Sequence, residues 1–307
     1  MQRTLLILCS FLLLGCQQQQ QKAVIVANSW LGAAPLFATV TTEPESFPAQ
    51  LKTVMLASDV SVLRMLSNGA AAGAIVTLDN ALGINTLTEG DYCIAMVVDH
   101  SRGADAILAR ADWSYDIHRP LRVGLEDSTL ARYMLTSWLK AANIPPRQVQ
   151  SSIMLPSEQL QAFTENKIDF IVTYQPFVER LKQVGANVIF SSRQHRLEIF
   201  DVLIVEKHRW PELSGAILSL REQTWPQTQR LLAEQSPQFW LALQALTDTN
   251  EAELQAGLQG IEFIGAGQQM QALEHVLGIS TPAIAAHLVE FGVYDRVTPL
   301  TQCGADS

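Results

Sequence analysis

Basic residues are few in this chain of 307 residues, which carries 21 Lys and Arg against 30 Asp and Glu. The net charge of −9 disfavours nucleic acid as a partner, because phosphate backbones are bound by clusters of positive charge. Beyond residue 21 there is no run of eighteen uninterrupted apolar residues, so we expect no membrane-spanning helix in the body of the chain. The length that remains is enough for two domains.

Catalytic motifs are also absent from the sequence. It contains no G-x-S-x-G elbow, no P-loop and no G-x-G-x-x-G. The histidines His118, His208, His275 and His287 are scattered without the spacing of metal ligands. We therefore expect a protein without enzymatic activity, without a cofactor and without a bound metal.

Cysteine is scarce, and only Cys93 and Cys303 lie outside the N-terminal leader. Cys93 falls in an apolar, strand-like run, and Cys303 falls in the C-terminal tail. In an oxidising compartment the two thiols can pair. We expect two free thiols, and a disulfide is the alternative that stays open.

The first twenty-one residues have the pattern of an export leader. Arg3 precedes an apolar stretch of ten residues at 5–14, broken only by Ser10 and too short to cross about 30 Å of hydrocarbon. Gly15-Cys16 resembles the bacterial lipobox, where the leader is cleaved and the cysteine lipidated. We predict a signal peptide over 1–15, lipidation at Cys16 and a polar tether over 16–22, on the periplasmic side of a bacterial membrane. An ordinary secretory signal is the alternative.

From residue 23 onward, short apolar runs alternate with amphipathic segments, and after Pro211 only about four helices are expected, over 213–294. A cap at Asn28 or Ser29 would start the first helix, and Asp79 would cap the third. The alternation predicts an α/β protein built on parallel sheets with helices on both faces. Strands are predicted at 23–27, 51–56, 74–77, 92–98, 106–109, 121–125, 149–154, 170–173, 188–190 and 200–205, and helices at 30–40, 59–68, from 79, and at 128–141, 158–166 and 177–184.

The second block of strands and helices is inserted in the first. The long strands at 92–98 and 200–205 flank it as two crossovers, which predicts one lobe from 23–105 and 202–307 and another from 106–201. Two lobes joined in this way leave a cleft at strand carboxyl ends and helix N-termini, where open α/β sheets bind ligands.

Four segments, in order, resemble one family: the ABC-transporter substrate-binding proteins for nitrate, alkanesulfonates, taurine and thiamine pyrimidine. Residues 98–107, VDHSRGADAI, are similar to its D-x-S-x-G-A-D-x-I segment, and residues 170–177, FIVTYQPF, to its D-A-V-x-x-W-E-P-F segment. Residues 29–36, SWLGAAPL, resemble W-x-G-x-x-P-L, and residues 200–205 resemble the return crossover strand. The resemblance covers 23 to about 205. It implies a type II periplasmic binding protein fold, a small-molecule ligand, an ABC permease as partner and a monomer.

The candidate ligand contacts lie at the ends of these segments. Trp30 is either an aromatic wall of the cleft or a packed core residue. Tyr174-Gln175 stands where the family has Trp-Glu, so Gln replaces a carboxylate. Arg102 is expected to be a solvated surface residue rather than a ligand contact. The full set of candidate contacts is Trp30, Ser58, Asp79, Ser101, Ser128, Tyr174 and Gln175, with Gly103, Asp105 and Asp201 as hinge or structural residues.

The sequence leaves the ligand and the downstream partner open. Sulfonate, nitrate, taurine and aminopyrimidine all remain possible ligand classes. A lipoprotein that reports its ligand state to a membrane receptor is one alternative to a transporter subunit, and an enzyme on the same scaffold is another. Both binding hypotheses require closure of the lobes by a hinge near the two crossovers.

Overall fold

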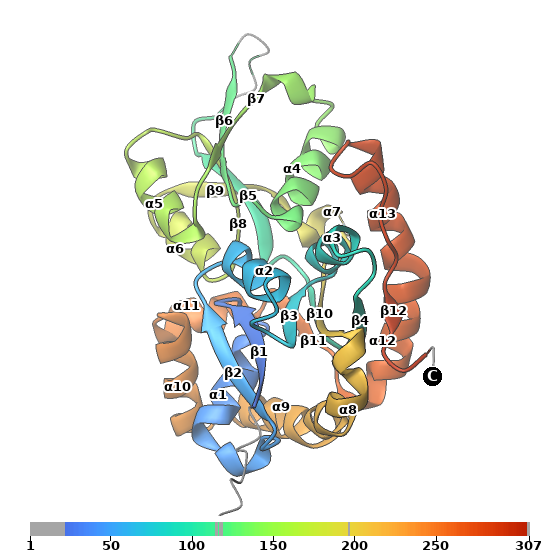
Figure 1. Ribbon diagram of the computed structural model, residues 1–307. Helices are drawn as coiled ribbons and strands as arrows, with labels where there is room; N and C mark the ends of the chain where they lie inside the picture. The colour runs from blue at the N-terminus through green and yellow to red at the C-terminus, as the bar shows by residue number, and fades with distance from the viewer. Residues whose placement is uncertain (1–21, 114–115, 117–118, 196, 306–307) are drawn as a thin grey trace, which may run out of the picture.

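Two β-sheets of different size organise the chain (Figure 1). The computed structural model describes residues 22–113, 116, 119–195 and 197–305. The predicted signal peptide and the lipidation site Cys16 lie outside these residues. One sheet has seven strands, in the order β11-β4-β10-β3-β1-β2 with β12 beside β4, and the other has five, in the order β7-β6-β8-β5-β9. We refer to the seven-stranded sheet with its helices as the first lobe, and to the five-stranded sheet with its helices as the second lobe.

The α/β architecture predicted from the sequence is confirmed, and each predicted strand is present with ends that differ by a few residues. The first lobe contains β1 (Ala23–Asn28), β2 (Leu51–Leu56), β3 (Gly73–Thr77), β4 (Tyr92–Ser101), β10 (Phe200–Glu206), β11 (Ile261–Phe263) and β12 (Thr301–Gln302). The second lobe contains β5 (Asp105–Arg110), β6 (Leu121–Leu125), β7 (Val149–Ile153), β8 (Phe170–Tyr174) and β9 (Ala186–Ser191).

The prediction of purely parallel sheets is wrong, because both sheets are mixed. In the first lobe β1 pairs parallel with β2 and β3, but β10 pairs antiparallel with β3 and β4. In the second lobe β5 pairs antiparallel with β8 and β9. In the first lobe the cause is the inserted second lobe: β4 carries the chain out of the first lobe and β10 brings it back directly beside β4, so these two strands run in opposite directions.

The expectation that strands end at Pro211 is also wrong. β11 pairs antiparallel with the end of β4, at residues 99–101, and β12 pairs parallel with its start, at residues 93 and 94. Both lie on the side of β4 that faces away from β10. Both are too short, at three and two residues, to produce a recognisable alternation of apolar and polar side chains.

Two serines begin the helices that face the junction of the lobes. Ser58 caps α2 and Ser128 caps α4, each hydroxyl accepting from the backbone N–H three residues later. The caps expected at Asn28 or Ser29 and at Asp79 are wrong: the first helix begins later, after Ala33, and the N-cap of α3 is Thr77. The helices are α1 (Ala34–Thr42), α2 (Asp59–Ser67), α3 (Leu78–Leu87), α4 (Thr129–Ala141), α5 (Pro156–Thr164), α6 (Phe177–Gln183), α7 (Ser192–His195), α8 (Trp210–Ser219), α9 (Trp225–Glu234), α10 (Pro237–Thr247), α11 (Glu251–Leu258), α12 (Gln269–His275) and α13 (Thr281–Glu290).

The last helices of the chain reach from the first lobe to the second (Figure 1). A π-helical segment (Val276–Ser280) joins α12 to α13, and α13 packs against both α3 and α4. At its far end His287 lies 2.8 Å from the Thr136 hydroxyl of α4, and Glu290 forms an ion pair with Lys140 of α4. The C-terminal helices therefore hold the two lobes against each other.

The same stretch, Ala266–Glu290, is long and apolar enough to cross a membrane by length and composition alone. Core helices of globular proteins meet the same criteria. Leu273, Val276, Ile284 and Leu288 are buried in the main core cluster, so one face of this stretch packs into the core of the protein.

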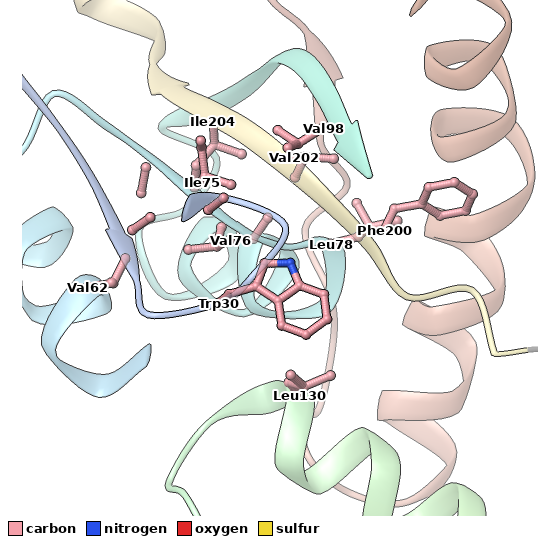
Figure 2. Packing of buried hydrophobic residues seen from close by; sticks show 14 of the residues in the cluster. Trp30, Val62, Ile75, Val76, Leu78, Val98, Leu130, Phe200, Val202 and Ile204 are labelled. Atoms are coloured by element: carbon pink, nitrogen blue, oxygen red, sulfur yellow. The ribbon is translucent and has the colours of Figure 1, made fainter. Parts of the chain in front are cut away.

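The main hydrophobic core runs without interruption through both lobes. It includes Val26 and Ile75 of the first sheet together with Val123 and Leu130 of the second lobe. Figure 2 shows the Trp30 indole of the first lobe next to Leu130 at the start of α4. Burial of apolar surface between the lobes thus stabilises the arrangement in which they touch.

Cys93 and Cys303 form a disulfide, so the expectation of two free thiols is wrong. The missed strand β12 is the reason: it places Thr301 opposite Cys93, and the Cys303 N–H donates to the Ile94 carbonyl oxygen. The two Cα atoms are then 4.9 Å apart, within the range that a disulfide spans.

We predict that replacing both Cys93 and Cys303 by Ser lowers the free energy of unfolding by about 2–5 kcal/mol, because the cross-link restricts the unfolded chain. Chemical denaturation of the oxidised protein, the double variant and the reduced protein measures the effect. The variant and the reduced protein should unfold at the same denaturant concentration. An oxidised protein no more stable than either would contradict the prediction.

Candidate ligand-binding site

A cavity lies at the carboxyl ends of β6 and β8, where α4 and α5 begin. Its volume is about 10 Å³, close to the space that one buried water molecule needs. This position, beside strand ends and helix N-termini, is where open α/β sheets bind ligands. The wall consists of Asp105, Glu126, Ser128, Leu130, Ala131, Met134, Pro156, Val172, Thr173 and Tyr174.

Several polar atoms in this wall have no hydrogen-bond partner. They are Asp105 Oδ2, Glu126 Oε2 and Thr173 Oγ1, on side chains that are nearly fully buried. A buried polar group without a partner costs about 1–3 kcal/mol relative to one that is satisfied. These atoms are therefore available for a bound molecule.

Six buried carboxyl groups gather where the two lobes meet, each no more than 3% exposed. They belong to Asp59, Asp79, Asp99, Asp105, Glu126 and Asp201. Among the described residues no Lys or Arg is buried, so no basic side chain neutralises the cluster. Arg102, near the crossover, has a side chain 49% exposed and pairs with Glu262, in agreement with its expected role as a surface residue.

Burial raises the pKa of these carboxyl groups, because a charged carboxylate loses its hydration in the interior. It raises the pKa of Asp79 and of Glu126 to about 8, with the negative charge of Asp59 adding to both shifts. The pKa of Asp105 rises to about 7 for the same two reasons. The pKa of Asp59 rises only to about 6, since the amides of Asn80 and Asn28 donate to its carboxylate.

Asp99 and Asp201 stand opposite each other on the two crossover strands β4 and β10. Their carboxyl groups hydrogen-bond to each other, which requires a proton on one of them. The Trp30 indole N–H also donates to Asp99, at 3.3 Å. Burial raises the pKa of both groups, that of Asp99 to about 7.

The helix N-termini at the junction are already bonded to the protein's own acceptors. The Val60 N–H at the start of α2 donates to Glu126 Oε1 across the junction, at 2.9 Å. The N–H groups of Thr129 and Leu130, at the start of α4, both donate to Asn80 Oδ1. N-terminal N–H groups are the usual site for an anionic ligand, and here side chains of the opposite lobe occupy them.

Comparison with solved structures shows the same fold over nearly the whole chain. The ligand-binding component of an ABC-type import system from Staphylococcus aureus, with zinc bound, has a TM-score of 0.73 at 12% identity, covering 92% of this chain and 97% of that one. The alkanesulfonate-binding protein SsuA from Xanthomonas axonopodis pv. citri, bound to MOPS, has a TM-score of 0.71 at 14% identity, covering 88% and 93%.

A Candida albicans protein described as exhibiting the generic periplasmic binding protein structural fold has a TM-score of 0.62 at 12% identity, covering 93% and 99%. This chain has the periplasmic binding protein fold. The fold implied by the sequence motifs is thus confirmed. No protein-family model matches the sequence, and no curated protein matches it.

The binding-protein fold brings several of the predicted site residues together. Tyr174 and Ser128 line the cavity, and so does Asp105, to which the sequence analysis assigns a structural role. Trp30 is buried beside the cavity wall, and its ring meets that of Tyr174 edge-on with centroids 6.0 Å apart. These residues come from both lobes.

The remaining predicted residues lie around this group. The Ser58 hydroxyl caps α2 and hydrogen-bonds to the Glu126 carboxyl group, and Asp79 accepts from the Thr77 hydroxyl. Ser101 is occupied within the crossover, where it bonds to Ser192 and accepts from the Asp105 N–H. Gln175 is buried and donates to Glu179.

The backbone conformation at the crossover explains why residue 103 is a glycine. Its φ of +114° is a conformation that side chains disfavour, and its N–H donates to the Ser192 hydroxyl.

Four residues of the candidate site were not predicted from the sequence: Asn28, Asn80, Glu126 and Thr173. Asn28 donates both to Asp59 and, across the junction, to the Tyr174 hydroxyl. A usable signal exists for Glu126, which follows a buried strand directly and precedes the Ser128 cap. No group of three or more His, Cys, Asp or Glu side chains within the described ranges is arranged to hold a metal ion.

We predict that the protein becomes less stable as the pH rises from 5 to 8. The carboxyl pKa values of the folded state exceed those of the unfolded chain, near 4, so the folded state holds more protons in this range. Each extra proton lowers the free energy of unfolding by about 1.4 kcal/mol per pH unit. Thermal denaturation in buffers across this range measures the slope.

Asp79→Asn should reduce that slope, because Asn cannot ionise. Asp127→Asn is the matched control, since the Asp127 carboxylate is half-exposed and pairs with Arg132. A melting temperature that rises from pH 5 to 8 would contradict the proposed protonation of the cluster.

Proposed function

We propose that this protein is the lipid-anchored solute-binding subunit of an ABC importer, related to the nitrate, sulfonate and taurine binding proteins. It captures a small polar molecule between its lobes, as a monomer, and delivers it to a membrane permease. The main support is a cavity with unpaired buried polar atoms in the second lobe, two of whose wall residues, Glu126 and Tyr174, bond to the first lobe, in a fold shared with a ligand-binding import component. The transfer of function from such neighbours is an analogy of fold.

The lobes predicted from the sequence, residues 23–105 with 202–307 and residues 106–201, differ by a few residues from the two sheets, because β5 begins at Asp105 and β10 at Phe200. The chain passes from the first sheet to the second at 102–104, and we assign the hinge to this segment and to residues 192–195 and 197–199, which precede β10. Opening about this hinge would separate Asn28 from Tyr174 and Val60 from Glu126, and so give a solute access to the cavity. The proposed ligand contacts are Tyr174, Ser128, Asp105, Glu126 and Thr173, with Trp30 behind Tyr174.

Two features support export and anchoring. Residues 1–15 have the pattern of a signal peptide, followed by Cys16 and a run of glutamines. The disulfide between Cys93 and Cys303 is typical of a protein that works in an oxidising compartment such as the periplasm.

A binding lipoprotein that signals to a membrane receptor is the second candidate, since it requires the same cavity and the same hinge. Permease and ATPase genes beside the gene for this protein would favour the importer, and a gene for a lone receptor would favour the sensor. An enzyme on this scaffold would change a bound candidate ligand chemically.

We predict that crosslinking in native membranes joins the full-length protein to a polytopic permease. The crosslinked partners are purified and identified by mass spectrometry, with a periplasmic protein of equal abundance as the control. Recovery of a permease with its ATPase is the expected result. Recovery of a signalling receptor in their place would overturn the importer and favour the sensor.

We also predict that Cys16→Ser moves the protein from the membrane fraction to the soluble periplasmic fraction, because the lipid would be its only strongly apolar attachment. Cell fractionation followed by a salt wash measures the distribution. Since the substitution leaves the folded body unchanged, the released protein should melt like the parent. A variant that stays in the membrane after the wash would contradict lipid anchoring.

A further inference from the structure

We infer that the cavity in the second lobe, beside its junction with the first lobe, selects a small organic cation, bound through N–H groups to the carboxylates of Asp105 and Glu126, and that it rejects anions such as sulfonate and nitrate. This inference rests on the proposed binding function and names the class of solute.

The first argument is the pattern of unpaired atoms. Asp105 Oδ2 and Glu126 Oε2 are hydrogen-bond acceptors without a donor, in the wall of one cavity. The Thr173 hydroxyl beside them also has no partner. Burial raises the pKa of Asp105 to about 7 and that of Glu126 to about 8, so near neutral pH a bound cation would take the place of a proton on these groups. The carboxylates that remain accept only, so their partners must be donors, and an ammonium, guanidinium or amino-heterocycle supplies such donors.

The second argument is the charge around the cavity. Asp59, Asp79, Asp99 and Asp201 surround the two wall carboxylates, and no Lys or Arg among the described residues is buried to balance them. A bound anion would add negative charge beside whichever of these carboxyl groups are ionised, in a medium of low dielectric constant where repulsion is strong. A cation would offset the cost of burying the carboxylates.

The third argument concerns the backbone groups that commonly bind anions. The N-termini of α2 and α4 point into the junction, but Glu126 and Asn80 already accept from their N–H groups. Glu126 thus takes the position of an anionic ligand at α2. An incoming sulfonate would have to displace it, and the displaced carboxylate would remain buried.

The apolar part of the wall fits the organic portion of such a cation. Leu130, Met134 and Val172 supply an aliphatic surface, and Tyr174 supplies an aromatic ring. A cation near such a ring gains a further electrostatic attraction. The cavity itself has a volume of only about 10 Å³, so an organic solute can reach these side chains only when the structure opens.

The test uses purified full-length protein in mild detergent and compounds of opposite charge. The cations are butylamine, 1,4-diaminobutane, butylguanidine, choline and 4-amino-2-methylpyrimidine, and the anions are butanesulfonate and nitrate. Butylamine and butanesulfonate share one alkyl chain and differ in the sign of the head group. At least one cation should raise the melting temperature by several degrees at saturation, and neither anion should raise it.

Substitutions then locate the binding. Asp105→Asn and Glu126→Gln keep size and remove charge, and each should weaken binding of that cation by about ten- to a hundredfold in calorimetry. Asp127→Asn, one residue beyond Glu126 and half-exposed, should leave the affinity unchanged. Melting of each variant without added solute verifies that it is folded. Unchanged affinity in both wall variants would overturn the assignment of the site.

The outcomes separate this inference from the proposed function. Stabilisation by butanesulfonate or nitrate and by no cation would overturn the cation site and leave a solute-binding protein. Stabilisation by none of the compounds would likewise overturn the cation site, while membrane crosslinking, which uses no solute, would still decide the importer. A cation that binds to a protein without a permease partner would uphold this site and overturn the importer.

Discussion

Burial of negative charge without a buried basic partner is the constraint on which the junction of the lobes depends. Each carboxyl group there must hold a proton, accept from an amide or backbone N–H, or stay unsatisfied. Asp59 accepts hydrogen bonds from the amides of Asn28 and Asn80. Asp99 and Asp201 hold a proton between them. Asp105 and Glu126 retain free oxygen atoms in the cavity wall. The same constraint thus determines which groups fix the structure and which are left for a solute.

Two opposing contributions to the free energy determine whether the lobes are closed or open. The continuous apolar core and the contacts of α13 with α4 favour the arrangement in which the lobes touch. Ionisation of the buried carboxyl groups favours separation, because an open junction returns water to them. A bound donor would remove that electrostatic cost and leave the apolar contacts in place. A solute can therefore shift the equilibrium only through its preference for the closed arrangement.

The sequence predicted the strands well because each carries a short apolar run between turn residues, as in 51–56 and 121–125. It failed where partners lie far away in the chain. The two-residue strand β12 has no pattern of its own, and with it the disulfide of Cys303 was missed. In the candidate site, the motifs were enough to predict Ser128 and Tyr174. The role of Asn28 depends instead on its contacts with Asp59 and with Tyr174, which lies 146 residues after Asn28 in the chain. The local sequence pattern carries no information on contacts between residues so far apart in the chain.

The disulfide between Cys93 and Cys303 closes a covalent ring that contains both crossovers and the entire second lobe. A single cut by a protease anywhere between these cysteines opens the ring without producing two molecules. The pieces remain joined through the disulfide until a reductant is added. The helical stretch Ala266–Glu290 therefore stays attached beside α4. A protein exposed to extracytoplasmic proteases would therefore tolerate one cleavage in a surface loop of the second lobe and still present an assembled cleft.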